Sequence, residues 1–87
     1  MKADDILLRV IALATHIAGP DRTPREIWPN TSLTEGGLWL DSVALLEVIV
    51  ACEAEFAVEF DSEEDLSTQA LASLGSLATV IQRKLEQ

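Results

Sequence analysis

Hydrophobic positions recur with a helical period near the start of the chain, over residues 3–18. They are spaced three or four residues apart: Ile6, Val10, Leu13 and Ile17. This spacing places them along one face of an amphipathic α-helix. The dipeptide Gly19-Pro20 suits the end of that helix, because glycine accepts the conformation of a helix cap and proline cannot continue the hydrogen-bond ladder.

A second helix is predicted over residues 42–56, with Asp41 as its N-cap. Its apolar residues form two strips around the helix axis. The inner strip, expected to face the core, consists of Leu45, Ile49, Cys52 and Phe56. The outer strip consists of Val43, Leu46 and Val50. Because one packed interface requires only one strip, the outer strip is expected to face a partner or a ligand.

The remaining pattern predicts two further helices and a long loop. Residues 61–65 form an acidic helix start, and a short, weak helix is predicted from there to about residue 70. Ser73 suits the N-cap of a last helix over residues 74–85. Residues 19–39 form a loop that large apolar side chains are expected to pin across the helices: Ile27, Trp28, Leu33 and Leu38. We therefore predict an all-α fold, a four-helix up-down bundle with a long first loop and a short third helix.

Length, composition and charge restrict the class of protein. The chain has 87 residues, the size of a single domain over residues 1–87, and 48% of them are hydrophobic, too many for a disordered acidic tail. Its net charge of -9 argues against nucleic acid and anionic membranes as partners, because both are bound through Lys and Arg. A single cysteine and the lack of a long uncharged apolar run lead us to expect a cytoplasmic monomer.

The sequence offers few groups for catalysis of its own. It has one histidine, no glycine-rich phosphate loop and no recognisable cluster of metal ligands, so we expect no enzymatic activity. Ser42, directly after Asp41, stands out. In one interpretation both residues are ordinary helix caps. In the other, Ser42 is the substrate of another enzyme, and a phosphate attached there would meet free backbone N–H groups at a helix N-terminus.

Several segments together resemble the acyl carrier protein family. Residues 38–43 contain its Asp-Ser signature, residues 46–49 continue an acidic second helix, and residues 52–60 close that helix with a Glu-rich turn and Phe. Residues 65–68 and 73–77 also look like carrier sequence. With the acidity and the length, the resemblance covers the whole chain and favours the substrate interpretation.

The resemblance implies a specific chemistry. A Mg-dependent phosphopantetheinyl transferase would attach phosphopantetheine from coenzyme A to Ser42, and the thiol of this arm would carry acyl groups as thioesters between enzymes. Asp41 matches the family residue that helps the transferase position its metal and the serine. Glu47, Glu53 and Glu55 match acidic positions that pair with Lys and Arg in basic patches of acyl-loading and acyl-processing enzymes. The apolar positions that contact the same enzymes are matched by Val43, Leu46 and Val50.

Three residues depart from the family pattern. Trp39 stands where a small residue, usually Gly, is common, and Ala44 and Ala54 stand where acidic residues are frequent. We therefore predict a carrier of a specialised pathway, for an unusual lipid or a polyketide, rather than of housekeeping fatty acid synthesis. Trp39 is expected to anchor the loop in the core, or to contact a partner or cover the acyl chain.

Two alternatives to an acyl carrier stay open at this point. A peptidyl or aminoacyl carrier uses the same arm for a different cargo, although such carriers are usually less acidic. A non-modified acidic helical adaptor would bind a basic partner without any arm.

For the acyl carrier, the aliphatic interior is expected to leave room for part of a bound chain. Cys52 is expected to be a buried core residue and not the thiol that carries the acyl group.

Overall fold

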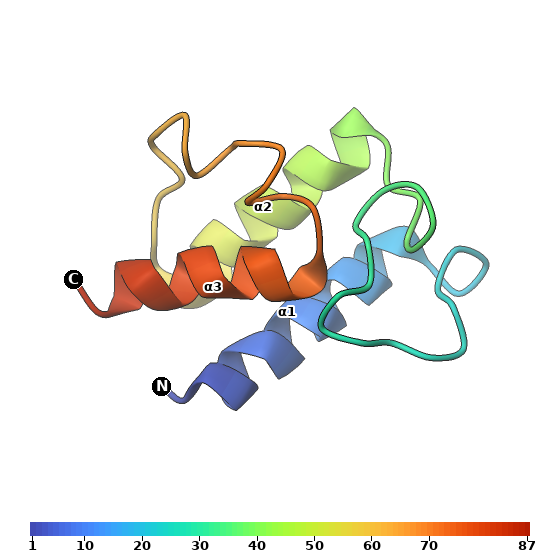
Figure 1. Cartoon of the computed structure of the whole chain (residues 1–87), viewed down its shortest axis with the longest axis horizontal. Helices are drawn as coiled ribbons and strands as arrows, with labels where there is room; N and C mark the ends of the chain where they lie inside the picture. The colour runs from blue at the N-terminus through green and yellow to red at the C-terminus, as the bar shows by residue number, and fades with distance from the viewer.

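The computed structural model describes all residues, Met1–Gln87, and contains three α-helices and no β-strand. The helices are α1 (Ala3–Ala18), α2 (Ser42–Phe56) and α3 (Leu74–Leu85). In Figure 1, α1 runs from left to right, and α2 and α3 run back in the opposite direction. α1 packs against both of the others. The all-α class and the bounds of these three helices are confirmed. None of the three has the length and apolar character required to cross a membrane.

Local capping groups fix the ends of the helices. α1 ends at Gly19, whose φ of 83° is in the region that favours glycine. α2 begins after Asp41, whose carboxylate accepts a hydrogen bond from the N–H of Ala44 at 2.8 Å. α3 begins with a capping box in which Ser73 and Ser76 each accept a bond from the other's backbone N–H.

The predicted short third helix is not formed, so the four-helix bundle is corrected to three helices. Residues 61–72 make separate turns instead. Within them the Ser62 hydroxyl accepts a bond from the N–H of Asp65 at 3.2 Å, and the Ser67 hydroxyl accepts one from the N–H of Ala70 at 3.1 Å. Such side-chain bonds to the nearby backbone compete with the hydrogen-bond ladder of a helix. The acidic start signal was therefore not sufficient to propagate a helix.

A cluster of 17 buried apolar side chains forms the core. The long first loop reaches it through Leu33 and Leu38, which are fully buried as predicted, while Ile27 packs against it half-buried. Trp28, predicted as a further anchor, is instead 59% exposed. Two leucines are therefore the main apolar anchors of this loop.

The inner strip of α2 is confirmed in most of its members. Ile49, Cys52 and Phe56 are buried, whereas Leu45 is half-buried near the start of the helix. Val48, which was not assigned to the strip, is fully buried. The buried face of α2 is therefore wider on one side than the sequence pattern indicated.

Backbone hydrogen bonds join the long first loop to the segment that leads into α3. The N–H of Leu33 donates to the carbonyl of Ala72 at 3.1 Å, and the N–H of Gly75 donates to the carbonyl of Pro29 at 2.7 Å. A Cβ at Gly75 would lie 2.8 Å from that carbonyl oxygen, so a side chain there would force the two segments apart. These contacts hold the long loop in place before it turns toward α2.

Candidate functional site at the start of α2

Asp41 and Ser42 lie at the end of α2 where that helix begins, at the upper right of Figure 1. The carboxylate of Asp41 is the N-cap, through its bond to the N–H of Ala44. Ser42 is the first residue of the helix and is exposed. The capping interpretation therefore holds for Asp41, and it leaves the hydroxyl of Ser42 free of a capping role and accessible to a second molecule.

The start of α2 is electrostatically suited to a phosphate group. The positive end of the helix dipole lies there, and the first turn of α2 contains no acidic side chain. Several N–H groups of a first turn have no partner within the helix, and they can donate to an anion. The helix dipole and the remaining free N–H groups therefore favour a phosphodiester on Ser42, while the carboxylate of Asp41, which already accepts the N–H of Ala44, opposes it.

The segment before α2 is a set of tight turns that fixes where the helix begins. The N–H of Leu38 donates to the carbonyl of Ser32 at 2.9 Å, and the N–H of Leu40 donates to the carbonyl of Leu33 at 3.0 Å. Leu38 and Leu40 are both buried. A Cβ at Gly37 would collide with the backbone of Ser32, so the turn requires glycine there. This anchored segment holds the start of α2 against the core.

Trp39 projects out of this segment between the two buried leucines. Its backbone φ is 54°, in the left-handed region, and its side chain is 60% exposed. The predicted role as an anchor in the core is therefore wrong. Contact with a partner and coverage of an acyl chain remain as predicted roles for its indole.

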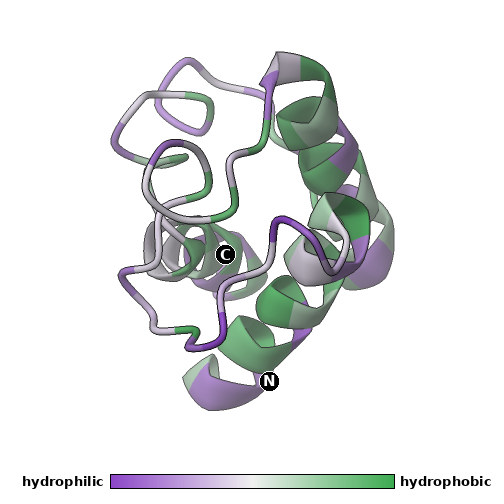
Figure 2. Ribbon diagram, turned by 90° about the vertical axis from the view of Figure 1, so that its right-hand side faces the viewer, coloured by the Kyte–Doolittle hydropathy of each residue, from purple (hydrophilic) through white to green (hydrophobic).

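The outer strip of α2 is a continuous exposed apolar surface. Val43, Leu46 and Val50 are between 54% and 67% exposed. The ribbon of α2, at the upper right of Figure 2, is coloured as hydrophobic on most of its turns, so its apolar character is not limited to the side facing the core. An apolar strip that the fold leaves uncovered is typical of an interaction surface.

The three acidic residues of α2 have different environments. Glu47 is exposed, and it lies one turn from residues of the outer strip on either side. The carboxylate of Glu53 accepts a hydrogen bond from the N–H of Phe60 at 2.9 Å, and Glu55 forms an ion pair with Arg9 of α1 at 2.8 Å. Glu47 is thus the acidic residue of α2 that is free for a partner, while the other two also stabilise the chain itself.

An open groove lies one helical turn from Ser42. It has a volume of about 360 Å³, and its apolar lining comes from Leu45 of α2 and from Leu66 and Leu71 of the turns before α3. A larger hollow of about 630 Å³ lies between those turns and α3, but its lining is mainly polar and includes no residue of α2. The smaller groove is the one placed to receive an apolar group attached at Ser42.

Cys52 has the environment of a structural residue. Its thiol is fully buried, and burial, reinforced by the charges of Glu53 and Glu55, raises the pKa of Cys52 to about 12. A thiol with this pKa remains protonated and unreactive near neutral pH. The structure contains no group of three or more His, Cys, Asp or Glu side chains that could hold a metal ion.

Comparisons of the chain with family models, with curated proteins and with solved structures find no match. The geometry around Ser42 and the residues of its sequence signature are therefore the grounds for a functional proposal. Sequence reasoning missed the groove, because Leu66 lies in the segment predicted as a weak helix and Leu71 directly follows it. Their signal was the presence of large aliphatic residues in an otherwise polar stretch.

Proposed function

We propose that the chain is an acyl carrier protein that bears a phosphopantetheine arm on Ser42 and serves a specialised lipid or polyketide pathway. The observation that supports this most directly is the exposure of Ser42 at the first position of α2, while Asp41 caps the helix. A serine that caps its own helix would have its hydroxyl engaged. Here the hydroxyl is available for esterification next to the residue that resembles the family's signature aspartate.

The modification would be a phosphoryl transfer by a second enzyme. The hydroxyl oxygen of Ser42 attacks the β-phosphorus of coenzyme A, and a new P–O bond forms to the serine. The bond from that phosphorus to the departing adenosine 3′,5′-bisphosphate breaks, and the hydroxyl proton passes to a base of the transferase. Mg²⁺ on the transferase would neutralise charge on the phosphates, with Asp41 beside it. The chain supplies the nucleophile and its position, and no catalytic group.

The surface around Ser42 supports transient contact with several enzymes. α2 contains no Lys or Arg, and Glu47 lies beside the outer strip. Exposed ion pairs contribute about 0–1 kcal/mol each, so attraction to a basic patch accelerates association without holding the complex tightly. A carrier that must leave each enzyme after one step requires this combination of fast association and weak binding.

The groove beside α2 suits an aliphatic cargo. Its leucine lining lies within reach of a flexible arm on Ser42, and an apolar chain gains free energy by leaving water. We therefore favour an acyl cargo over a peptidyl one. In the acylated protein, the amide resonances of Leu45, Leu66 and Leu71 should shift as the acyl chain lengthens, and they should stay unchanged with an arm that carries glycine.

The decisive experiment is incubation of the chain with coenzyme A, Mg²⁺ and a broad-specificity phosphopantetheinyl transferase, followed by intact mass measurement. The mass should rise by one phosphopantetheine group, and peptide mapping should place that group on Ser42. S42A should show no increase in mass while it folds as the wild type does, because Ser42 is not the cap.

The chain offers a matched control for this experiment. Asp61-Ser62 is a second exposed Asp-Ser pair, but it lies in a turn and not at the start of a helix. S62A should be loaded as fast as the wild type. A wild-type chain that gains no mass would leave only the acidic adaptor as an interpretation, and attachment of the arm elsewhere than at Ser42 would refute the proposed site.

A further inference from the structure

The backbone of Trp39 has a conformation that a bulky residue adopts only at an energetic cost. Its φ of 54° lies in the left-handed region, which disfavours residues with a Cβ. Ala57 is the other non-glycine residue with a positive φ, but it is the C-cap of α2, where that conformation is common. Trp39 is not at a helix C-terminus, so its conformation requires a different explanation.

The strained conformation places the indole in solvent. Leu38 and Leu40 on either side are 0% and 4% exposed, and hydrogen bonds hold the backbone on both sides and at Trp39 itself, whose N–H donates to the carbonyl of Thr34 at 2.9 Å. The side chain of Trp39 nevertheless remains 60% exposed. The indole itself gains no burial from this strain, and strained residues are concentrated at functional sites in proteins.

Trp39 lies within the area that any enzyme acting on Ser42 must cover. Three residues of chain span at most about 11 Å, which limits the distance between the Cα atoms of Trp39 and Ser42. A standard interface buries about 800 Å² on each partner, the area of a disc about 16 Å in radius. An interface centred on Ser42 therefore includes Trp39.

The surroundings of Trp39 define the chemistry of such a partner. Glu35, Asp41 and Glu47 are exposed acidic residues that precede and follow it in the chain, and the groove lined by Leu45 does not include the indole. Trp39 is thus an exposed apolar side chain in an acidic stretch of the sequence. Exposed aromatic residues of this kind dominate the binding energy of many interfaces.

We propose that Trp39 is the anchor by which a phosphopantetheinyl transferase that esterifies Ser42 binds this chain, with the indole entering an apolar pocket bordered by Lys or Arg. This inference rests on the proposed function, since it requires that Ser42 is modified. It adds the recognition element for that reaction, at a position where the resembling family usually has glycine.

The test compares the kinetics of phosphopantetheine transfer from coenzyme A to the wild type and four variants, with the broad-specificity transferase as the enzyme. W39A and W39G should raise the KM for the chain about tenfold or more, the effect expected of an interface anchor, and leave kcat within about twofold. W39F, which keeps an aromatic ring, should stay within about threefold of the wild-type KM.

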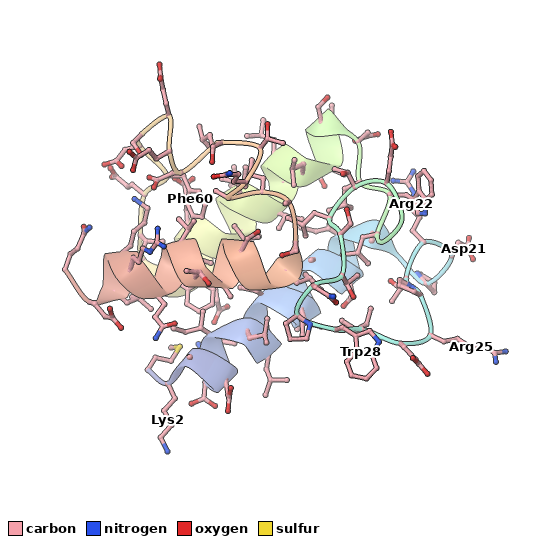
Figure 3. The ribbon with its side chains drawn as sticks, in the orientation of Figure 1. Lys2, Asp21, Arg22, Arg25, Trp28 and Phe60 are labelled. Atoms are coloured by element: carbon pink, nitrogen blue, oxygen red, sulfur yellow. The ribbon has the colours of Figure 1, made fainter.

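W28A is the matched control, because Trp28 is 59% exposed but lies at the lower edge of the molecule in Figure 3, away from the start of α2 at the upper edge. Its KM should equal that of the wild type. Urea unfolding gives a second control: the midpoint of W39G should be at or above that of the wild type, because glycine relieves the left-handed strain. Weaker recognition with undiminished stability excludes misfolding as the cause.

A wild-type KM for W39A and W39G would overturn the inference while leaving the carrier function intact. If acyl thioester hydrolysis is also faster in W39G, the indole is assigned to coverage of the arm. Failure of the wild type to accept the arm is a different outcome, and it would refute the proposed function itself.

Discussion

At the scale of single residues, Asp41 combines two roles that substitution can separate. Its carboxylate caps α2, and it lies beside the hydroxyl that we propose is esterified. D41A should lower the free energy of unfolding by about 1 kcal/mol through loss of the cap, whereas D41N should stay within about 0.5 kcal/mol of the wild type, because asparagine caps nearly as well.

Both variants should be poor substrates for phosphopantetheine transfer, since both lack the charge beside Ser42. Urea unfolding and the rate of mass increase measure the two effects on the same samples. Normal loading of D41N would show that Asp41 acts on α2 alone.

Cys52 leads to a prediction about thiol reactivity. Because burial and two neighbouring carboxylates raise the pKa of Cys52 to about 12, its thiol should resist alkylation in the folded chain at pH 8. The unmodified protein should therefore incorporate no iodoacetamide unless urea is added, and the protein with its arm should incorporate one equivalent. Mass spectrometry after timed labelling distinguishes these cases. Labelling of Cys52 in the native, unmodified chain at the rate of a free thiol would contradict its buried environment.

Whole helices were predictable because their end signals are local. Gly19, Asp41 and Ser73 act within one turn of the helix they terminate, and the structure confirms all three caps. The predicted short third helix does not form. Ser62 and Ser67 accept hydrogen bonds from backbone N–H groups in turns, and helix propensity alone does not take these bonds into account.

Tertiary features were harder to predict because they do not depend on local signals. Trp28 has the size of an anchor, but the backbone bonds between its loop and the start of α3 hold that segment and leave the indole exposed. The burial of Val48 depends on neighbours that periodicity does not identify. At the site, the position of Ser42 could be predicted from the cap signal, while the φ of Trp39 could not.

At the scale of elements, ion pairs of Lys84 link the turns of residues 61–72 to α3. Its ammonium group is 2.6 Å from the carboxylate of Asp65 and 3.3 Å from that of Asp61, and it lies 5.9 Å from the ring centroid of Phe60. Burial opposes ionisation of Asp65, but hydrogen bonds from Lys84 and from the N–H of Asp61 outweigh it and lower the pKa of Asp65. The bond to Asp65 in turn raises the pKa of Lys84.

K84M should remove these ion pairs and lower the free energy of unfolding by about 1–2 kcal/mol. This lies between the stability contributions of exposed and of buried ion pairs. Amide hydrogen exchange should accelerate first in residues 61–72. K2M is the matched control, because Lys2 projects from the N-terminal end of α1 (Figure 3) and forms no ion pair. Equal exchange in the two variants would mean that the contacts of Lys84 contribute no local stability.

The pH dependence has a defined sign. Because the pKa of Asp65 is lower in the folded chain than in the unfolded one, its contribution is fully present above the unfolded value of about 3.9. The contribution is lost as the pH falls through the folded value. The wild type should thus lose more stability than K84M on acidification below about pH 4, and the two should respond alike between pH 6 and pH 8.

For the whole molecule, the net charge of -9 should have opposite effects on folding and on recognition. Mutual repulsion among its carboxylates destabilises the compact state, while their field attracts an enzyme with a basic surface. Raising the salt concentration from about 0.02 M to about 0.5 M shortens the screening length severalfold, so it should raise the urea midpoint of the chain and lower kcat/KM for phosphopantetheine transfer about tenfold.

Recognition by the enzyme should depend on the negative charge on α2 and not only on the net charge of the chain. Glu47 lies beside the outer strip, whereas Glu86 lies just beyond α3, at the end of the molecule opposite to the start of α2 in Figure 1. E47Q and E86Q remove the same charge, but only E47Q should reduce kcat/KM at low salt and flatten its salt dependence. Transfer rates measured across the salt series test this directly. Equal effects of the two substitutions would mean that the enzyme responds to net charge alone, and the surface beside Ser42 would then have no particular role in its recognition.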